Sequence, residues 1–142
     1  MSMSKMTSDL WKKVEHFKPD GADRWGDPFQ METSIIFTLV KFRKYVGRPV
    51  HVHCGFEARA TSGWHPAGCA VDIHVEGLHV VDQYLAAERF DEFNGIGIYP
   101  NWNNPGLHLD TRPHDKTAID SRWACLESGV YIPLNWDFLK RL

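Results

Sequence analysis

The sequence predicts an α+β fold, in which one domain holds a mainly antiparallel sheet flanked by helices. Its 142 residues suit a single domain over residues 1–142, and 43% hydrophobic and 24% charged residues are ordinary values for a globular protein. The expected order of elements is helix, strand, strand, helix, strand, strand. Crowded short strands with few helices favour a mainly antiparallel sheet.

The first helices are expected in residues 8–17 and 29–46. Ser8 is a possible N-cap of the first helix, and a turn-rich loop separates the two. Gly47 and the basic residues before it suit the end of the second helix. Apolar side chains recur at helical spacing in this second segment, at Ile35, Ile36, Leu39, Val40 and Phe42.

Two strands are expected in residues 48–56 and 69–75, with a loop between them. In the first strand, valines and Cys54 alternate with His51 and His53, so the two histidines share a face. The second strand alternates in the same way. Its Val71, Ile73 and Val75 point one way, and its Ala70, Asp72 and His74 point the other way.

The second half of the chain adds a helix and further strands. In order, these are a helix in residues 80–93, a strand in 95–100, a strand in 107–112, and a last strand or short helix in 118–129. His108 and Asp110 share one face of the strand in 107–112. The apolar tail is expected to pack back on the body.

Composition excludes several kinds of partner and site. The formal net charge is −2 and there is no basic run, so we expect no nucleic-acid partner. No apolar run approaches the roughly 20 residues of a membrane helix, so we expect no membrane partner. The first residues lack the apolar core of a secretory signal, which predicts synthesis in the cytoplasm. Three cysteines without a CxxC pair argue against a disulfide framework and a cysteine-based zinc site.

Two expected strands and a loop carry residues that predict a metal site. His65 lies in the loop, Asp72 in the strand that follows, and His108 in a later strand. Imidazole and carboxylate are good zinc ligands, and a catalytic zinc site needs three protein ligands with one position open for water. Gly68 and Ala70 are small enough for the loop to run close against a metal. Such spacing also occurs by chance, in which case these side chains face water.

The segment from His65 to Asp72, HPAGCAVD, resembles the HxxGxAxD motif of the M15 zinc peptidases. That family includes D-Ala-D-Ala carboxypeptidases and phage L,D-endopeptidases, and it shares a fold with the Hedgehog signalling domain. The segments GIGIYPNWNNPGLHLDTRP and GRPVHVHCGF are similar to two further parts of the family pattern, and the resemblance covers about residues 29–125. It implies a Hedgehog/DD-peptidase-like fold and one zinc ion per chain, bound by His65, Asp72 and His108.

The chain departs from the family pattern around these ligands. The family has a serine two positions before the first ligand, where this chain has Gly63, with Ser62 one position earlier as a candidate for substrate binding. The family arginine that steadies the substrate carbonyl is Glu57 here, and Arg59 is a candidate to replace it. Many members have an acidic base three positions before the last ligand, and that position is Pro105.

Two acids are therefore candidates for the catalytic base. Asp110 lies on the same strand face as His108, and Glu57 lies near the site if its corner is placed as in the family. The alternative interpretations are that Asp110 orients a metal ligand and that Glu57 faces water. His53 is a candidate for stabilising an oxyanion, and a solvent-facing strand residue would show the same pattern.

Other polar and aromatic residues flank the motifs. Tyr99 and nearby tryptophans are candidates for the wall of a peptide groove or for the core. Arg112 is a candidate for binding a substrate carboxylate or for pairing with an acid. His74 suits the wall of the cleft better than a fourth ligand position, because a fourth ligand would close the site to water. Cys69 suits packing better than nucleophilic catalysis.

Together these residues predict a zinc-dependent peptidase. Its substrates would be peptides of bacterial cell-wall peptidoglycan, hydrolysed by zinc-activated water. A chain of this kind without a signal peptide resembles phage or prophage products that reach the cell wall after lysis or within a virion. The main alternative is a non-catalytic zinc-containing module that binds the cell wall or forms part of a virion. An unrelated globular protein and a cysteine hydrolase are more distant alternatives.

Overall fold

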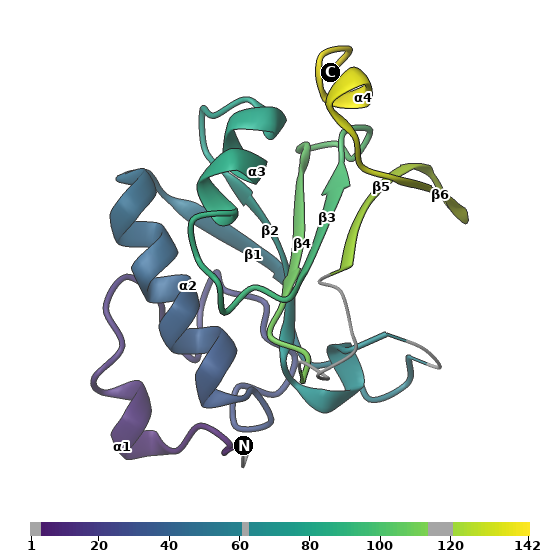
Figure 1. The fold of residues 1–142 in the computed structure, drawn as a ribbon. Coiled ribbons are helices and arrows are strands. Elements are labelled where there is room, and N and C mark those ends of the chain that lie inside the picture. The colour runs from purple at the N-terminus through teal and green to yellow at the C-terminus, as the bar shows by residue number, and fades with distance from the viewer. Residues whose placement is uncertain (1–3, 61–62, 114–120) are drawn as a thin grey trace.

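A six-stranded sheet forms the centre of the computed structural model, which describes residues 4–60, 63–113 and 121–142. Within this part of the chain the strands lie in the order β1-β2-β4-β3-β5-β6 (Figure 1). Neighbouring strands are antiparallel except for β3 and β5, which are parallel. The strands are β1 (Val50–Cys54), β2 (Ala70–Val75), β3 (Gly95–Tyr99), β4 (Gly106–Asp110), β5 (Ser121–Glu127) and β6 (Val130–Pro133). The predicted α+β class with a mainly antiparallel sheet is confirmed.

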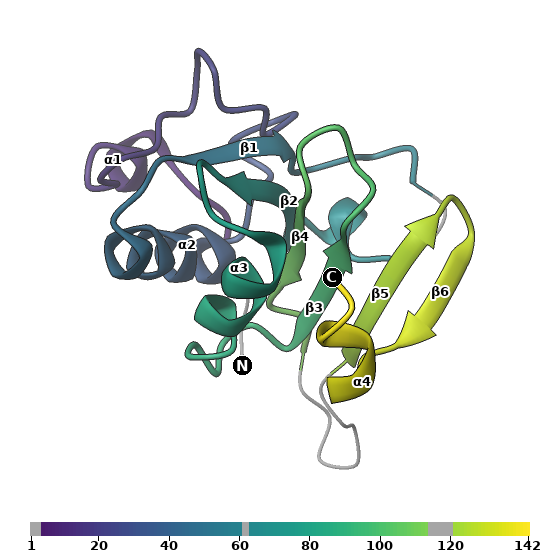
Figure 2. The same ribbon diagram turned by 90° about the horizontal axis from the view of Figure 1, so that it is seen from above.

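Two helices cover one face of the sheet. Helix α2 (Thr33–Val46) and helix α3 (Val80–Ala87) lie on this face, whereas the short 3₁₀ helix η1 (His65–Ala67) lies on the other (Figure 2). Helix α2 ends at Gly47, whose left-handed φ of 65° favours glycine. The helix predicted in residues 29–46 is confirmed from residue 33 onward. In the part of the chain that is described, no helix is long and apolar enough to cross a bilayer.

The two ends of the chain differ in detail from their predictions. Helix α1 spans only Ser8–Trp11, and its N-cap is Thr7, whose hydroxyl accepts the N–H of Leu10. The prediction of Ser8 as N-cap was therefore wrong by one residue. The segment predicted as a strand or a short helix contains β5, and the tail packs back as β6 and α4 (Trp136–Leu139).

Helix α3 ends earlier than its apolar pattern suggested. The segment after Ala87 makes short turns instead of continuing the helix. These turns bring Phe90 and Phe93 edge-on against Phe42 of α2, at ring centroid distances of 6.2 and 6.0 Å. Packing between the two helices therefore takes precedence over local helix propensity here.

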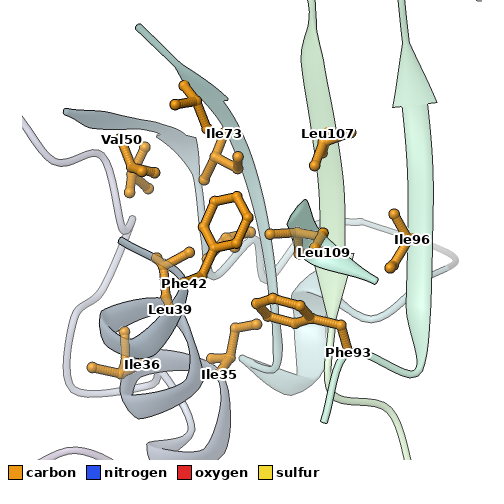
Figure 3. Close-up of a cluster of buried hydrophobic side chains, with 14 of the residues drawn as sticks. Ile35, Ile36, Leu39, Phe42, Val50, Ile73, Phe93, Ile96, Leu107 and Leu109 are labelled. Atoms are coloured by element: carbon orange, nitrogen blue, oxygen red, sulfur yellow. The ribbon is translucent and has the colours of Figure 1, made fainter. Parts of the chain in front are cut away.

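The hydrophobic core lies between the helices and the sheet. Figure 3 shows Leu39 and Phe42 of α2 beside Ile73 of β2 and Leu109 of β4. The largest buried side chains of this cluster include Ile35, Ile36, Leu39, Phe42, Ile73, Ile96, Ile98, Leu107 and Leu109. Because successive strand residues point to opposite faces, the residues that alternate with these apolar side chains lie on the face away from the helices.

Candidate metal centre

The three predicted ligands meet on the face of the sheet opposite the helices. Asp72 of β2 and His108 of β4 are directly opposite each other in the antiparallel ladder, and His65 comes from η1 above this face. Asp72 Oδ1 lies 3.4 Å from His65 Nε2 and 3.2 Å from His108 Nδ1. The two imidazole centroids are 5.2 Å apart. One carboxylate oxygen thus lies beside one nitrogen of each ring.

The second nitrogen of each imidazole contacts another part of the protein. His65 Nδ1 lies 2.6 Å from the carbonyl oxygen of Gly55, and His108 Nε2 lies 2.7 Å from Asp110 Oδ2. A carbonyl and a carboxylate both accept hydrogen bonds, so these two nitrogens donate. A neutral ring then keeps its lone pair on the nitrogen that faces Asp72, which is the usual arrangement of metal-binding histidines.

Cys54 joins this cluster, although the sequence pattern did not predict it. Cys54, His65 and Asp72 each offer a ligand atom within 4.8 Å of the others, so this group could hold a metal ion. Strict alternation places Cys54 with the core valines, but the β1–β2 register shifts between Val52 and Cys54. This bulge directs the thiol toward the site. The register that pairs Cys54 with Asp72 is the signal that would have identified it.

In the metal-free cluster, the Asp72 carboxylate and the two imidazoles favour one another's charged forms. Burial opposes the charge on His65, but hydrogen bonds with Asp72 and Cys54 outweigh it and raise the pKa of His65 to about 10. Burial also favours a neutral Asp72, but hydrogen bonds from His108 and His65 lower the pKa of Asp72 to about 2. The pKa of His108 is raised, because hydrogen bonds with Asp110 and Asp72 outweigh burial. A bound dication would replace protons on both imidazoles.

Gly68 allows the loop that carries His65 to approach the sheet. It ends η1 in the left-handed conformation, with φ of 78°, and a Cβ there would overlap the carbonyl oxygen of Gln30. Lys5 Nζ fixes this crossing by donating to the carbonyl oxygens of Gln30 and Ala67, at 2.9 Å each. The close approach at Gly68 is thus to the Gln30 backbone, and the expectation that Gly68 and Ala70 let the loop run close against a metal stays a prediction.

Asp110 is fully buried directly behind His108. Its carboxylate accepts Arg112 Nε at 2.8 Å and Arg112 Nη2 at 2.7 Å, besides His108 Nε2. Burial opposes the charge, but these hydrogen bonds outweigh it and hold the pKa of Asp110 far below its ordinary value. A Cβ at Gly95, directly opposite on β3, would overlap this carboxylate. The glycine thus provides the space for the buried Asp110–Arg112 pair.

A pocket of about 540 Å³ opens over the three ligands. Its aromatic walls are Trp64, Tyr99, Trp123 and Tyr131. Trp123 packs over Gly97, where a Cβ would come within 2.5 Å of the indole, and Trp123 Nε1 donates to the Tyr99 hydroxyl at 3.2 Å. Arg112 also lines the pocket. A larger cavity of about 660 Å³ beside α3 does not include the ligands, so size alone does not identify the site.

Glu57 and Arg59, which were predicted near the substrate, are not among the described residues that line this pocket. Glu57 and Arg59 are exposed, and the Glu57 carboxylate accepts the backbone N–H of Arg59 at 3.1 Å. Ser62 lies outside the described residues. Gly63, at the position of the family serine, has φ of 82° and lines the pocket. Pro105 is exposed, and its carbonyl accepts a hydrogen bond from Gln83.

Two further histidines border the site without contacting its three ligands. His53 lines a neighbouring pocket of about 380 Å³ that also includes Asp72. His74 contacts His53, with His53 Nε2 and His74 Nδ1 2.6 Å apart. Cys69 is buried, and burial raises the pKa of its thiol to about 12, which disfavours a nucleophilic thiolate.

No protein-family model matches the chain, and no curated protein matches it. The residues of the site and the motif that contains them therefore carry the functional argument.

Proposed function

We propose that this chain is a zinc-dependent peptidase with a Hedgehog/DD-peptidase-like fold that hydrolyses amide bonds in peptidoglycan peptides. One observation carries the proposal. His65 Nε2 and His108 Nδ1 both lie beside Asp72 Oδ1, while the other nitrogen of each ring contacts an acceptor. The resemblance of this segment to the HxxGxAxD motif supports the reaction type and the substrate class.

The proposed donor set for one zinc ion per chain is His65, Asp72 and His108, and His108 Nδ1 would have to approach His65 to complete it, because the atoms already within 4.8 Å of one another belong to Cys54, His65 and Asp72. Two imidazoles on a tetrahedral zinc, with Zn–N distances of about 2.0–2.1 Å, have centroids about 5.2 Å apart. The observed separation is 5.2 Å. We place Cys54 outside the ligand set, because its sulfur lies 3.7 Å from His65 Nδ1, the nitrogen that contacts Gly55. A bound zinc ion would supply Lewis-acid chemistry, polarising a carbonyl and lowering the pKa of water.

The residues around the ligands orient the site and form its walls. Asp110 is engaged by Arg112 and His108, so we assign to it the orientation of His108 rather than proton transfer. Arg112 in turn fixes Asp110 and forms one side of the pocket. Tyr99 and Trp123 offer aromatic surface to a peptide.

The remaining polar candidates act from the rim. His53 lines the pocket on the other side of Asp72, where its ring can donate a hydrogen bond to a substrate oxygen. Glu57 is the acid that remains for proton transfer, and the turn that carries it would have to bring its carboxylate to the pocket. Arg59 lies on the same turn and would move with it.

Digestion of purified peptidoglycan tests this proposal. We expect the zinc-loaded chain to release new amino groups from wall peptides, to lose this activity with a chelator and to regain it with zinc. His108→Ala should be inactive, whereas the matched control His16→Asn, which removes an exposed imidazole elsewhere, should be active. Glu57→Gln should lower the rate by about 10²–10⁴-fold if Glu57 transfers the proton. Zinc-loaded wild type that releases no amines would refute the peptidase.

The positions of the acidic side chains favour a second function. Among the described residues that line the pocket over the ligands, Asp72 is the only acid, because Asp110 lies buried behind His108 and Glu57 lies outside. This is the arrangement expected of a non-catalytic zinc-containing module that binds the cell wall or belongs to a virion. Such a module would retain wall peptides in a sedimentation assay without releasing amines.

A further inference from the structure

Three more histidines form a cluster on the same face of the sheet. His51 and His53 lie two residues apart on β1, and His74 of β2 is directly opposite His51 in the antiparallel ladder. The ring of His74 lies between the other two, with centroid distances of 4.7 Å to His51 and 4.8 Å to His53. We call these residues the strand histidines.

In the contact between His53 and His74, one ring nitrogen donates a hydrogen bond and the other accepts it through its lone pair. Their ring planes are nearly parallel, at 11°, and His53 Nε2 lies 2.6 Å from His74 Nδ1. One ring N–H therefore donates to the lone pair of the other ring.

Negative charge lies on both sides of the strand histidines. The Glu76 carboxylate is 3.8 Å from His51 Nε2, and Asp72 lines the same pocket as His53. A dication bound between the rings would be attracted by both carboxylates.

We propose that the strand histidines form a second metal site, for a transition-metal dication that prefers imidazole, such as Zn²⁺, Ni²⁺ or Cu²⁺. Three imidazoles form a known zinc donor set that leaves one position open. A tetrahedral zinc spaces its nitrogen ligands about 3.3 Å apart, so the 2.6 Å contact between His53 and His74 must open by less than an ångström. His51, which stacks on His74 at 4.7 Å, must also rotate, because the ligand atoms of these three residues do not yet lie within 4.8 Å of one another. His51 and His53 are exposed and His74 is half-buried, which leaves room for this rotation.

The second site does not rest on the proposed function, because none of the strand histidines belongs to the set of His65, Asp72 and His108. It would nevertheless adjoin the first site, since the pocket lined by His53 also includes Asp72. The residues described around that pocket include no lysine or arginine. The second cation would therefore supply positive charge to polar substrate groups there.

Zinc stoichiometry after equilibrium dialysis tests the proposal. With zinc in excess we expect about two equivalents per chain in wild type and about one in His53→Ala, His74→Ala and His108→Ala. The double variant His74→Ala/His108→Ala should bind none. His16→Asn is the matched control and should bind as wild type does. The His53 and His74 variants should fold, because these side chains lie outside the core.

Each outcome separates this inference from the proposed peptidase. A single equivalent in wild type that is lost in His108→Ala and kept in His74→Ala would overturn the second site and leave the peptidase standing. A single equivalent lost in His74→Ala and kept in His108→Ala would support the strand histidines and refute the proposed catalytic centre. A Cu²⁺ electron paramagnetic resonance spectrum of His108→Ala provides a second readout, since it should show hyperfine coupling to imidazole nitrogens that His74→Ala removes. An unchanged spectrum in the double variant would also overturn the second site.

Discussion

Replacing Asp110 by asparagine tests whether this acid orients the proposed metal ligand His108. The substitution keeps the shape of the side chain and removes its charge. Asp110 Oδ1 accepts the Arg112 Nε and backbone N–H groups, and Oδ2 accepts His108 Nε2 and Arg112 Nη2. An asparagine has one carbonyl oxygen, so whichever way it is placed its NH₂ group faces two donors.

The size of the effect follows from these contacts. If the amide NH₂ faces His108, the ring proton must move to Nδ1, which is the nitrogen beside Asp72. Loss of such an orienting partner typically weakens metal binding about 10–100-fold, which corresponds to about 1.4–2.7 kcal/mol. The half-buried Arg112 guanidinium also loses its counter-ion, so the loss of folding stability should be smaller than the about 3–5 kcal/mol that breaking a fully buried pair costs.

Two measurements on the same protein check these values. Competition with a chromophoric chelator gives the zinc affinity, and thermal unfolding without zinc gives the stability. The matched control is Asp137→Asn, because Asp137 is 82% exposed and its carboxylate lies 3.4 Å from Lys140 Nζ, which is itself exposed. This control should leave both quantities unchanged. A folded Asp110→Asn variant with wild-type zinc affinity would refute the role of Asp110 in orienting His108. Arg112→Lys, which keeps Asp110 ionised, should lose less zinc affinity than Asp110→Asn.

Three further predictions concern the pH dependence of stability, the thiol and the strand glycine. In the metal-free protein, the raised pKa of His65 contributes stability that is fully present below pH 6.5 and is lost as the pH rises through about 10. The lowered pKa of Asp72 contributes stability that is present above pH 3.8 and is lost as the pH falls through about 2. Melting temperatures measured with a chelator should therefore be highest between pH 3.8 and 6.5, and this plateau should be lower in His65→Ala. The same pH profile in wild type and variant would contradict the ion pair. Cys54→Ala should retain zinc, and the Co²⁺-loaded wild type should lack a thiolate charge-transfer band; the presence of that band would place the thiol in the ligand set. Gly97→Ala should displace the indole of Trp123 and shift its fluorescence while zinc remains bound. An unchanged spectrum would show that the position of the indole does not require a residue without Cβ at position 97.

The part of the site that could be predicted from the sequence depends on simple alternation. The period of two along β2 and β4 places Asp72 and His108 on the face away from the apolar residues, and the structure has them there. The loop with Gly68 delivers His65 to the same face because only glycine fits beside Gln30. These are local rules, and they hold where the strands are regular.

The rest depended on irregularities and long-range packing. The bulge between Val52 and Cys54 breaks the alternation, so the thiol was assigned to the wrong face. The parallel pairing of β3 with β5 has no signature in either strand alone. The sequence left open whether Arg112 binds a substrate carboxylate or pairs with an acid, and the structure shows that it pairs with the buried Asp110, which was a candidate base.

The order of the strands separates the two halves of the pocket. The proposed ligands Asp72 and His108 lie on the central strands β2 and β4, and His65 comes from the loop that leads into β2. The walls formed by Trp123 and Tyr131 instead come from the β5–β6 hairpin at the edge of the sheet. In the proposed peptidase, substitutions at Tyr131 of this hairpin would therefore change which peptides the pocket accepts, whereas substitutions at Trp123, whose ring lies 5.1 Å from that of His108, would also affect the proposed metal ligands.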